Sequence, residues 1–346
     1  MALQIARFDT ANQDDVSGLA AVIAGLGADR IARIAVFLKV EGDYDDGSRE
    51  RARAALEKLI ADTGLADRAQ LLTAVGCEGV STPFGYALVQ LKDLPASGGT
   101  APRLAMGVAR SDAPPADELD SAVLAHRVAD TVRAAVADAG LSIEQVAMCF
   151  VKVPQPPAGA GRAQPVRGRR TRAVAALGAG MALGEVDPKR VTDAVIAADP
   201  TLHSRRAQTF AGPEVTRVEV IVLGNKPGAG GDLMAVSTLT EDLIDALSLK
   251  RMLLRAGLKL DAEGELADAQ RVAALFIKAG PSADGRIRGA RTTIYNSGIT
   301  PEKHMRAAQS GMLAALLGTT RVFNTGDPVQ QAPEGGAVAC ALVRME

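Results

Sequence analysis

The chain has no tryptophan, and only three of its 346 residues are tyrosine. Its charge is nearly balanced, with 39 basic against 40 acidic residues, and no basic stretch carries interleaved aromatic residues. Proteins that bind nucleic acid usually present a basic surface and stack bases on aromatic side chains. The composition therefore indicates that nucleic acid is not a partner.

Cysteine is scarce as well. Cys77, Cys149 and Cys340 are odd in number, far apart, and set in apolar or glycine-rich surroundings. This spacing predicts neither a disulfide framework nor a zinc site. We expect reduced thiols that have a structural role.

Long apolar runs are also missing. The longest apolar windows, such as residues 218–223, are far shorter than the roughly 20 residues that a membrane-spanning helix needs. The beginning of the sequence has no basic segment followed by a hydrophobic one, as a secretory signal would have. We therefore expect a cytoplasmic protein without a membrane partner.

The strongest pattern that is present is an internal repeat. Residues 172–184 read RAVAALGAGMALG, residues 306–318 read RAAQSGMLAALLG, and residues 51–64 read RARAALEKLIADTG with one residue more. Each segment begins with arginine, has small residues and leucine at helical spacing, and ends at glycine, which favours the helix C-cap. Three copies predict three homologous units.

A short apolar run that ends in lysine comes before each copy. IAVFLK ends at Lys39, VAMCFVK at Lys152 and VAALFIK at Lys278. Runs of this length that are rich in Val, Ile and Phe predict buried strands. The spacing of the lysines is too large for a solenoid repeat. We predict an α+β fold with three units, which are given by residues 1–111, 112–248 and 249–346.

Equivalent side chains converge where three similar units surround an axis, so we predict that the three lysines face one cavity together with Arg51, Arg172 and Arg306. A single lysine at a strand end, or a single helical arginine, usually extends to solvent, but recurrence in all three copies favours a site. Burial and mutual repulsion lower a lysine pKa, and a neutral lysine is a base or nucleophile. Arginine stays charged and binds planar oxygen-bearing groups. The expected ligand is small, planar, carbonyl-rich and anionic.

Eight segments resemble the ring-opening cyclic amidohydrolases, the family of cyanuric acid hydrolase and barbiturase. In chain order they are DDVSGL, LKVEG, GCEGVSTPFG, RLAMGVA, ALGEV, VEVIVLGN, KHMRAAQSGMLAALLG and APEGG. The resemblance implies three domains around a pseudo-threefold axis, with sheets in a barrel-like core and helices outside. It also implies hydrolysis of one amide bond in a cyclic imide or ureide, and a homotetramer.

In this family each domain contributes a lysine, an arginine and a serine to the central site. The lysines and arginines named above match, but the serine positions hold Ala74, Phe210 and Thr325. Phe210 stands where the nucleophile is usually placed, so a ring with a carbonyl on every side should fit poorly. The residues that we expect to contact the substrate beside the arginines are Ala74, Val75, Phe210, Ala211 and Gly326.

The resemblance leaves the nucleophile open. Thr325 with Lys278 is the best remaining pair of a hydroxyl and a lysine. Ser81, Thr82 and Thr209 lie near the altered turns, and Lys152 or a lysine-activated water is a further alternative. We expect no cofactor and predict no metal-ligating side chain, although the QQAPEGG turn keeps part of an ion-binding segment that would suit a structural divalent cation.

Three functions stay open from the sequence. The first is ring-opening hydrolysis of a cyclic amide that is less symmetric than cyanuric acid. The second is a lysine-dependent tautomerase, isomerase or decarboxylase, because a neutral lysine moves protons or forms an imine. The third is a non-catalytic protein that binds a heterocycle, because a chain without the three serines resembles a pseudoenzyme.

Overall fold

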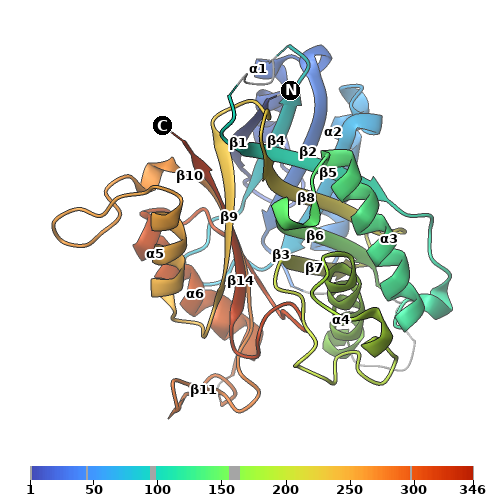
Figure 1. Cartoon of the computed structure of the whole chain (residues 1–346), viewed down its shortest axis with the longest axis vertical. Helices are drawn as coiled ribbons and strands as arrows, with labels where there is room; N and C mark the ends of the chain where they lie inside the picture. The colour runs from blue at the N-terminus through green and yellow to red at the C-terminus, as the bar shows by residue number, and fades with distance from the viewer. Residues whose placement is uncertain (1, 44–45, 94–98, 156–163, 297, 346) are drawn as a thin grey trace.

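The computed structural model describes residues 2–43, 46–93, 99–155, 164–296 and 298–345, without the side chains of 164–167. Three units follow one another with the same element order, strand, helix, strand, helix, strand, strand (Figure 1). The first unit consists of β1 (Leu3–Asp9), α1 (Ser17–Leu26), β2 (Ile31–Val40), α2 (Ser48–Asp62), β3 (Ala69–Val75) and β4 (Phe84–Leu91). The second consists of β5 (Arg103–Arg110), α3 (Ala122–Ala139), β6 (Val146–Pro154), α4 (Gln164–Ala182), β7 (Ala207–Gly212) and β8 (Glu219–Lys226).

The third unit adds a short hairpin to the same plan. It consists of β9 (Leu233–Thr240), α5 (Ala246–Arg255), β10 (Val272–Ala279), the hairpin β11 (Arg286–Ile287) and β12 (Ala290–Arg291), α6 (Pro301–Leu317), β13 (Phe323–Gly326) and β14 (Ala337–Arg344). The glycines that close the three repeated helices, Gly64, Gly184 and Gly318, all have a positive φ of 65° to 70°. A left-handed residue of this kind ends a helix, as the repeat predicts.

Each unit forms one four-stranded mixed sheet, and the three strand orders are equivalent: β1-β4-β2-β3, β5-β8-β6-β7 and β9-β14-β10-β13. This equivalence supports the three-unit fold. It corrects the predicted boundaries, because β5 pairs with β8 and β9 pairs with β14. Strand pairing thus assigns β5, which begins at Arg103, to the second unit and β9, which begins at Leu233, to the third. Both units therefore include residues before the predicted starts at 112 and 249. The sequence of an edge strand predicts its buried face but does not identify its partner.

The three sheets meet at an aromatic cluster. Phe37, Phe150 and Phe276 each lie two residues before a lysine of the repeat, and their ring centroids are 4.8 to 4.9 Å apart in all three pairs. Edge-to-face and tilted pairs of this kind contribute about 0.5–1.5 kcal/mol each beyond their buried area. Because side chains alternate along a strand, each lysine shares the inner face of its sheet with a phenylalanine.

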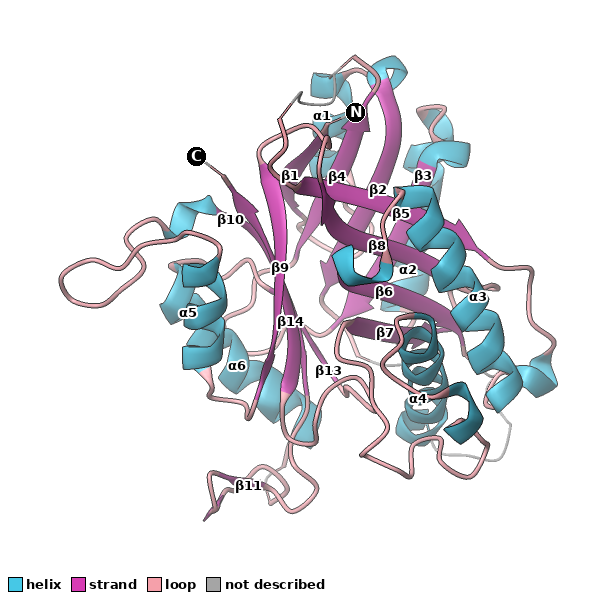
Figure 2. Cartoon of the chain, viewed as in Figure 1, coloured by secondary structure: helices cyan, strands magenta, loops and turns pink. Residues whose placement is uncertain are grey.

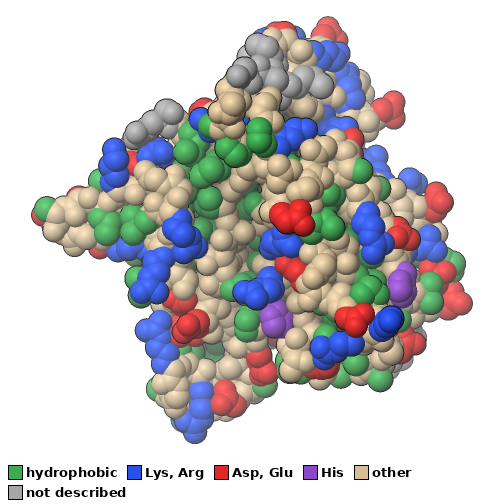
Figure 3. Space-filling model, viewed as in Figure 1, with side chains coloured by type: hydrophobic (Ala, Val, Ile, Leu, Met, Phe, Trp, Pro, Cys, Tyr) green, Lys and Arg blue, Asp and Glu red, His purple; other side chains and the backbone are tan. Residues whose placement is uncertain are grey.

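Helices cover the outer faces of the sheets (Figure 2). In the second unit, Gly107 of β5 lets α3 approach closely, because a Cβ atom there would lie 2.0 Å from the carbonyl oxygen of Ala135. Hydrogen bonds divide the described strands into separate sheets that pack around the aromatic cluster, and these strands form no closed hydrogen-bonded barrel. Acidic and basic side chains are interspersed on the face shown in Figure 3. No helix among the described residues is long and apolar enough to span a membrane.

Candidate active site

The strand register places the three lysines beside the predicted serine positions. In the parallel pairs, Lys39 lies opposite Ala74, Lys152 opposite Phe210, and Lys278 opposite Thr325. All three lysines are buried, with at most 2% of each residue exposed. Burial penalises the charged form of an amine, so these positions favour lowered lysine pKa values.

A cavity of about 250 Å³ lies where the three units meet. This volume suits a ligand of one small ring, because pockets for drug-sized molecules usually have about 300 Å³ or more. Two of the lysines line it, Lys152 and Lys278, and so do the residues predicted to contact substrate, which are Ala74, Val75, Phe210, Ala211, Thr325 and Gly326. A larger adjoining groove of about 520 Å³ shares Arg169, Glu302 and Asp327 with the cavity, but the lysines do not line it. We therefore place the site in the smaller cavity.

Lys278 is the lysine best suited to act as a base. Its Nζ donates a hydrogen bond to the carbonyl oxygen of Gly326 at 2.6 Å and lies 4.6 Å from the ring centroid of Phe210. Burial holds the pKa of Lys278 well below its usual value. The positive charges of Arg172, Arg306 and Lys152 lower this pKa further, and the negative charge of Asp327 opposes the shift. A neutral amine with a free lone pair can accept a proton at the cavity wall.

Lys152 lies in a different environment. Its ammonium forms a buried ion pair with Glu214 and donates to the carbonyl oxygen of Thr73 at 3.2 Å. Burial lowers the pKa of Lys152 to about 8 although the charge of Glu214 opposes this shift. Burial of Glu214 would raise the pKa of that carboxyl, but the charges of Lys152 and Arg49 outweigh it and lower the pKa to about 2. Both groups are therefore charged at neutral pH.

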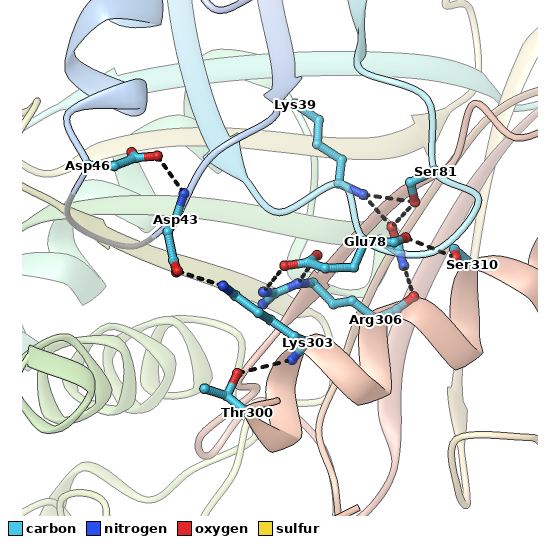
Figure 4. Close-up of polar contacts among 10 residues, drawn as sticks. Lys39, Asp43, Asp46, Glu78, Ser81, Thr300, Lys303, Arg306 and Ser310 are labelled. Atoms are coloured by element: carbon cyan, nitrogen blue, oxygen red, sulfur yellow. Dashed lines mark hydrogen bonds and ion pairs between the residues drawn. The ribbon is translucent and has the colours of Figure 1, made fainter. Parts of the chain in front are cut away.

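Lys39 does not line the cavity, which corrects the prediction that all three lysines point into it. Its Nζ donates to Oδ1 of Asn324 and, at 3.3 Å, to Oγ of Ser81, at the contact between the first and third units (Figure 4). The hydroxyl of Ser81 also donates to Oδ1 of Asn324 at 3.1 Å. Burial lowers the pKa of Lys39 to about 8. The ammonium of Lys39 is thus bound by Asn324, which is 285 residues away in the chain, and not placed in the cavity.

Two of the predicted arginines, Arg172 and Arg306, line the cavity. Each is paired with a carboxylate from the next unit around the axis. Arg306 binds Glu78 through two hydrogen bonds of 2.5 and 2.6 Å (Figure 4), and Nη2 of Arg172 binds Oδ2 of Asp327. These carboxylates orient the guanidinium groups and offset part of their charge.

Arg51 does not occupy the third arginine position. Its side chain is exposed and its Nη1 donates to the carbonyl oxygen of Asp46, whereas Arg49 is buried, lines the cavity and donates to the carbonyl oxygen of Ala211 at 2.8 Å. Helical spacing in the sequence distinguishes Arg49 from Arg51. Seven residues after Arg49 stands the buried Leu56, as Leu313 follows Arg306, but seven residues after Arg51 stands the exposed Lys58.

Comparison with known proteins identifies the family. The model described as "Amidohydrolase ring-opening protein" matches residues 4–344. The chain belongs to this family. A cyanuric acid amidohydrolase of Methylobacterium sp. (strain 4-46) is 35% identical, over 99% of this chain and 96% of its own. A cyclic amide hydrolase of Azorhizobium caulinodans is 32% identical, over 95% of this chain and 96% of its own.

Solved structures agree with this assignment. A cyanuric acid hydrolase from A. caulinodans matches with a TM-score of 0.88 at 32% identity, over 99% of both chains. A second cyanuric acid hydrolase structure, described as an innovation by structural concatenation, matches with a TM-score of 0.89 at 26% identity over 99% of both chains. Family membership places the chain among hydrolases that act on C–N bonds in cyclic amides.

The hydroxyl groups near the site differ in how firmly they are held. Thr325 lines the cavity and its Oγ1 donates weakly, at 3.4 Å, to the carbonyl oxygen of Ile277. Thr73 lines it too, but its hydroxyl donates to Glu214 at 3.0 Å. The hydroxyl of Thr209 is fully buried and donates to the carbonyl oxygen of Arg172 at 2.8 Å. Of these three, Thr325 has the hydroxyl most free to react.

The QQAPEGG turn named from the sequence bears on a structural cation. Within the described residues, no three His, Cys, Asp or Glu side chains gather as a metal site. In the QQAPEGG turn, Oε1 of Glu334 accepts a hydrogen bond from the backbone N–H of Ala283 at 2.7 Å, and a structural cation there stays a prediction.

Proposed function

We propose that the chain opens the ring of a small cyclic amide by hydrolysing one C–N bond, with Lys278 as the general base. The observation that carries this proposal is the contrast in lysine environments. Lys278 lines the cavity with a lowered pKa and has no carboxylate bound among the described residues, whereas Lys152 is held as a cation by Glu214. A base must be neutral before it can accept a proton.

The reaction would begin when the amine of Lys278 takes a proton from an attacking hydroxyl group, that of Thr325 or of a water molecule. The oxygen then adds to the amide carbonyl carbon, and negative charge develops on the carbonyl oxygen. Arg49 and Arg306 would donate hydrogen bonds to the ring oxygens and Arg172 would add positive charge, since fixed cations stabilise such charge in a site shielded from water. As the C–N bond breaks, the ammonium of Lys278 would return the proton to the leaving nitrogen. If Thr325 is the attacking group, an ester to its hydroxyl forms, and a water molecule that gives its proton to Lys278 would then hydrolyse this ester and restore the threonine hydroxyl.

Phe210 favours a ring that is less symmetric than cyanuric acid. Its side chain is at the cavity wall, 6% of the residue is exposed, and it offers no hydrogen bond where the family resemblance implies a serine. A carbonyl oxygen facing it would be left unpaired, at a cost of about 1–3 kcal/mol. We therefore expect a substrate with an apolar or substituted edge on this side.

The test is an assay of purified protein with a panel of cyclic imides, ureides and lactams, which follows ammonia, carbon dioxide and ring-opened product. Lys278→Met should strongly reduce turnover, whereas Lys58→Met, on the exposed face of α2, should not. Thr325→Val and Thr325→Ser separate the two nucleophiles, because a loss in Val that Ser restores would identify the threonine hydroxyl. Activity that survives in Thr325→Val would indicate water.

The other two functions give different results in the same assay. Trapping of a lysine adduct by borohydride, with no ring-opened product, would indicate imine chemistry. Tight binding of a ring without product would indicate a binding protein. The family relationship favours hydrolysis over both.

Phe210→Ser provides a direct test of the proposed substrate shape. The change adds back a hydroxyl opposite Lys152 in the strand register. We expect turnover of cyanuric acid to rise in this variant relative to the unaltered protein. Ordinary rates with cyanuric acid in the unaltered protein would contradict the proposed role of Phe210.

A further inference from the structure

The third unit carries a carboxylate where the other two carry glycine. Two residues after the strand partner of each lysine stand Gly76, Gly212 and Asp327. Asp327 has a φ of +58°, in the left-handed region that costs free energy for residues other than glycine, although aspartate and asparagine adopt it more readily than most. A strained residue at a site wall points to a role for its side chain.

The same comparison shows that the acidic residue of the third unit stands at a different repeat position from that of the other two units. Four residues after the strand partner, the first and second units carry Glu78 and Glu214, but the third carries Val329. Glu78 pairs with Arg306 and is not among the described residues that line the cavity, whereas Asp327 pairs with Arg172 and itself lines the cavity. The arginine keeps a carboxylate partner, but the negative charge now faces the substrate.

The surroundings of Asp327 keep it ionised. Oδ1 accepts a hydrogen bond from Nη1 of Arg169 at 2.9 Å, and Oδ2 contacts Arg172. Burial would raise the pKa of Asp327, but the charges of Arg172 and Arg169 outweigh it and lower that pKa. A carboxylate has about four acceptor sites and no donor, so the two arginine contacts leave capacity for a donor from a ligand.

We infer that Asp327 makes the cavity select a cyclic amide that presents an N–H or amino group, rather than a carbonyl, on the side of the third unit. A ring carbonyl on this side would face carboxylate oxygens, which repel it, while the guanidinium of Arg172 is already engaged by Asp327. An amino group would donate to the carboxylate instead. This inference rests on the proposed function and narrows its substrate class.

The competing role for Asp327 is to position Arg172 without contacting the substrate. The two roles predict different results with a matched pair of rings, cyanuric acid and the triazine in which an amino group replaces one of its oxygens. A positioning role would lower kcat/KM for both rings by a similar factor. A selecting role would change the ratio between them.

Asp327→Asn is the main test variant, since asparagine has the same shape, tolerates the left-handed backbone, and both accepts and donates hydrogen bonds. The unaltered protein should process the amino-substituted ring at least about tenfold better than cyanuric acid, and Asp327→Asn should reduce this ratio at least about tenfold. Asp327→Gly, which introduces the residue found at this position in the other two units, should reduce the same ratio. Asp93→Asn, on the exposed surface, controls for the loss of one charge.

Two outcomes would overturn the inference while the proposed function stands: a preference of the unaltered protein for cyanuric acid, or a ratio that Asp327→Asn leaves unchanged. If no ring is opened, the proposed function fails, and calorimetric affinities for the two rings still test the selectivity. The same preference for the amino-substituted ring, lost in Asp327→Asn, would then support the inference for binding alone. A thermal melt of each variant confirms that it is folded.

Discussion

Lys152 and Lys278 occupy equivalent places in two units of one fold, yet their surroundings differ in the charges that surround the amine. Each ends the inner face of a strand and has at most 2% of its surface exposed. Glu214 holds Lys152 as a cation, while Lys278 contacts a backbone carbonyl and the ring of Phe210. Repetition of a fold therefore repeats the position of a side chain, and the residues around it decide its chemistry.

The largest effect that we predict comes from removing the proposed base. Lys278→Met should lower kcat by about 10²- to 10⁴-fold, the usual contribution of a general base. Stability should stay equal or rise, because the change removes a buried amine that has no carboxylate bound among the described residues. Steady-state kinetics and urea unfolding measure the two effects. A variant that keeps full turnover would exclude Lys278 as the base.

Removing Lys152 should mainly affect stability. Lys152→Met leaves Glu214 charged and buried without its main partner, which costs about 3–5 kcal/mol of the free energy of unfolding. The double variant Lys152→Met with Glu214→Met should recover most of this loss, because it removes both charges. Urea unfolding of the single and double variants tests the pair. Equal stability of Lys152→Met and the unaltered protein would mean that the ion pair contributes little.

The strands that end in the three lysines could be predicted from their short apolar runs, whereas the strand partners Ala74, Phe210 and Thr325 were named because the family resemblance places serines there. The arginine in the first unit was placed wrongly, because the closing glycine served as the reference point. Arg49 and Gly64 are 15 residues apart, but Arg306 and Gly318 only 12, so the distance to the glycine is not preserved. A buried leucine stands seven residues after both Arg49 and Arg306, and the buried Ala179 stands seven residues after Arg172, so this spacing identifies Arg49.

The partners of these side chains could not be predicted in the same way. Asn324 binds Lys39 and Asp327 binds Arg172 across contacts between units, over 285 and 155 residues of sequence. Local periodicity carries no information on such contacts, since they depend on how the units pack. The same applies to the assignment of β5 and β9 to the following sheets.

A smaller effect separates Arg49 from Arg51. Arg49→Met should weaken substrate binding by about 1.5–3 kcal/mol, the scale of a hydrogen bond that involves a charged group. Arg51→Met removes the same charge from the same helix but from its exposed face, so affinity should change by less than about threefold. Calorimetric titration of both variants with one ring compares them directly. Equal losses would show that the effect is one of general charge and not of contact.

The smallest effect is a difference in how stability depends on pH. The folded-state pKa of Lys278 lies well below the value near 10.5 that the unfolded chain has, mainly because of burial. Between these two values the unfolded state binds the additional proton, so the free energy of unfolding rises with pH, by at most about 1.4 kcal/mol per pH unit for one group. Lys152, with a folded pKa of about 8, contributes in the same direction but only from about pH 8 upward. Lys278→Met should therefore flatten the rise in stability at pH values below 10.5. Urea unfolding at intervals from pH 6 to 10 measures the slopes, and a slope that Lys278→Met leaves unchanged would contradict the lowered pKa of Lys278.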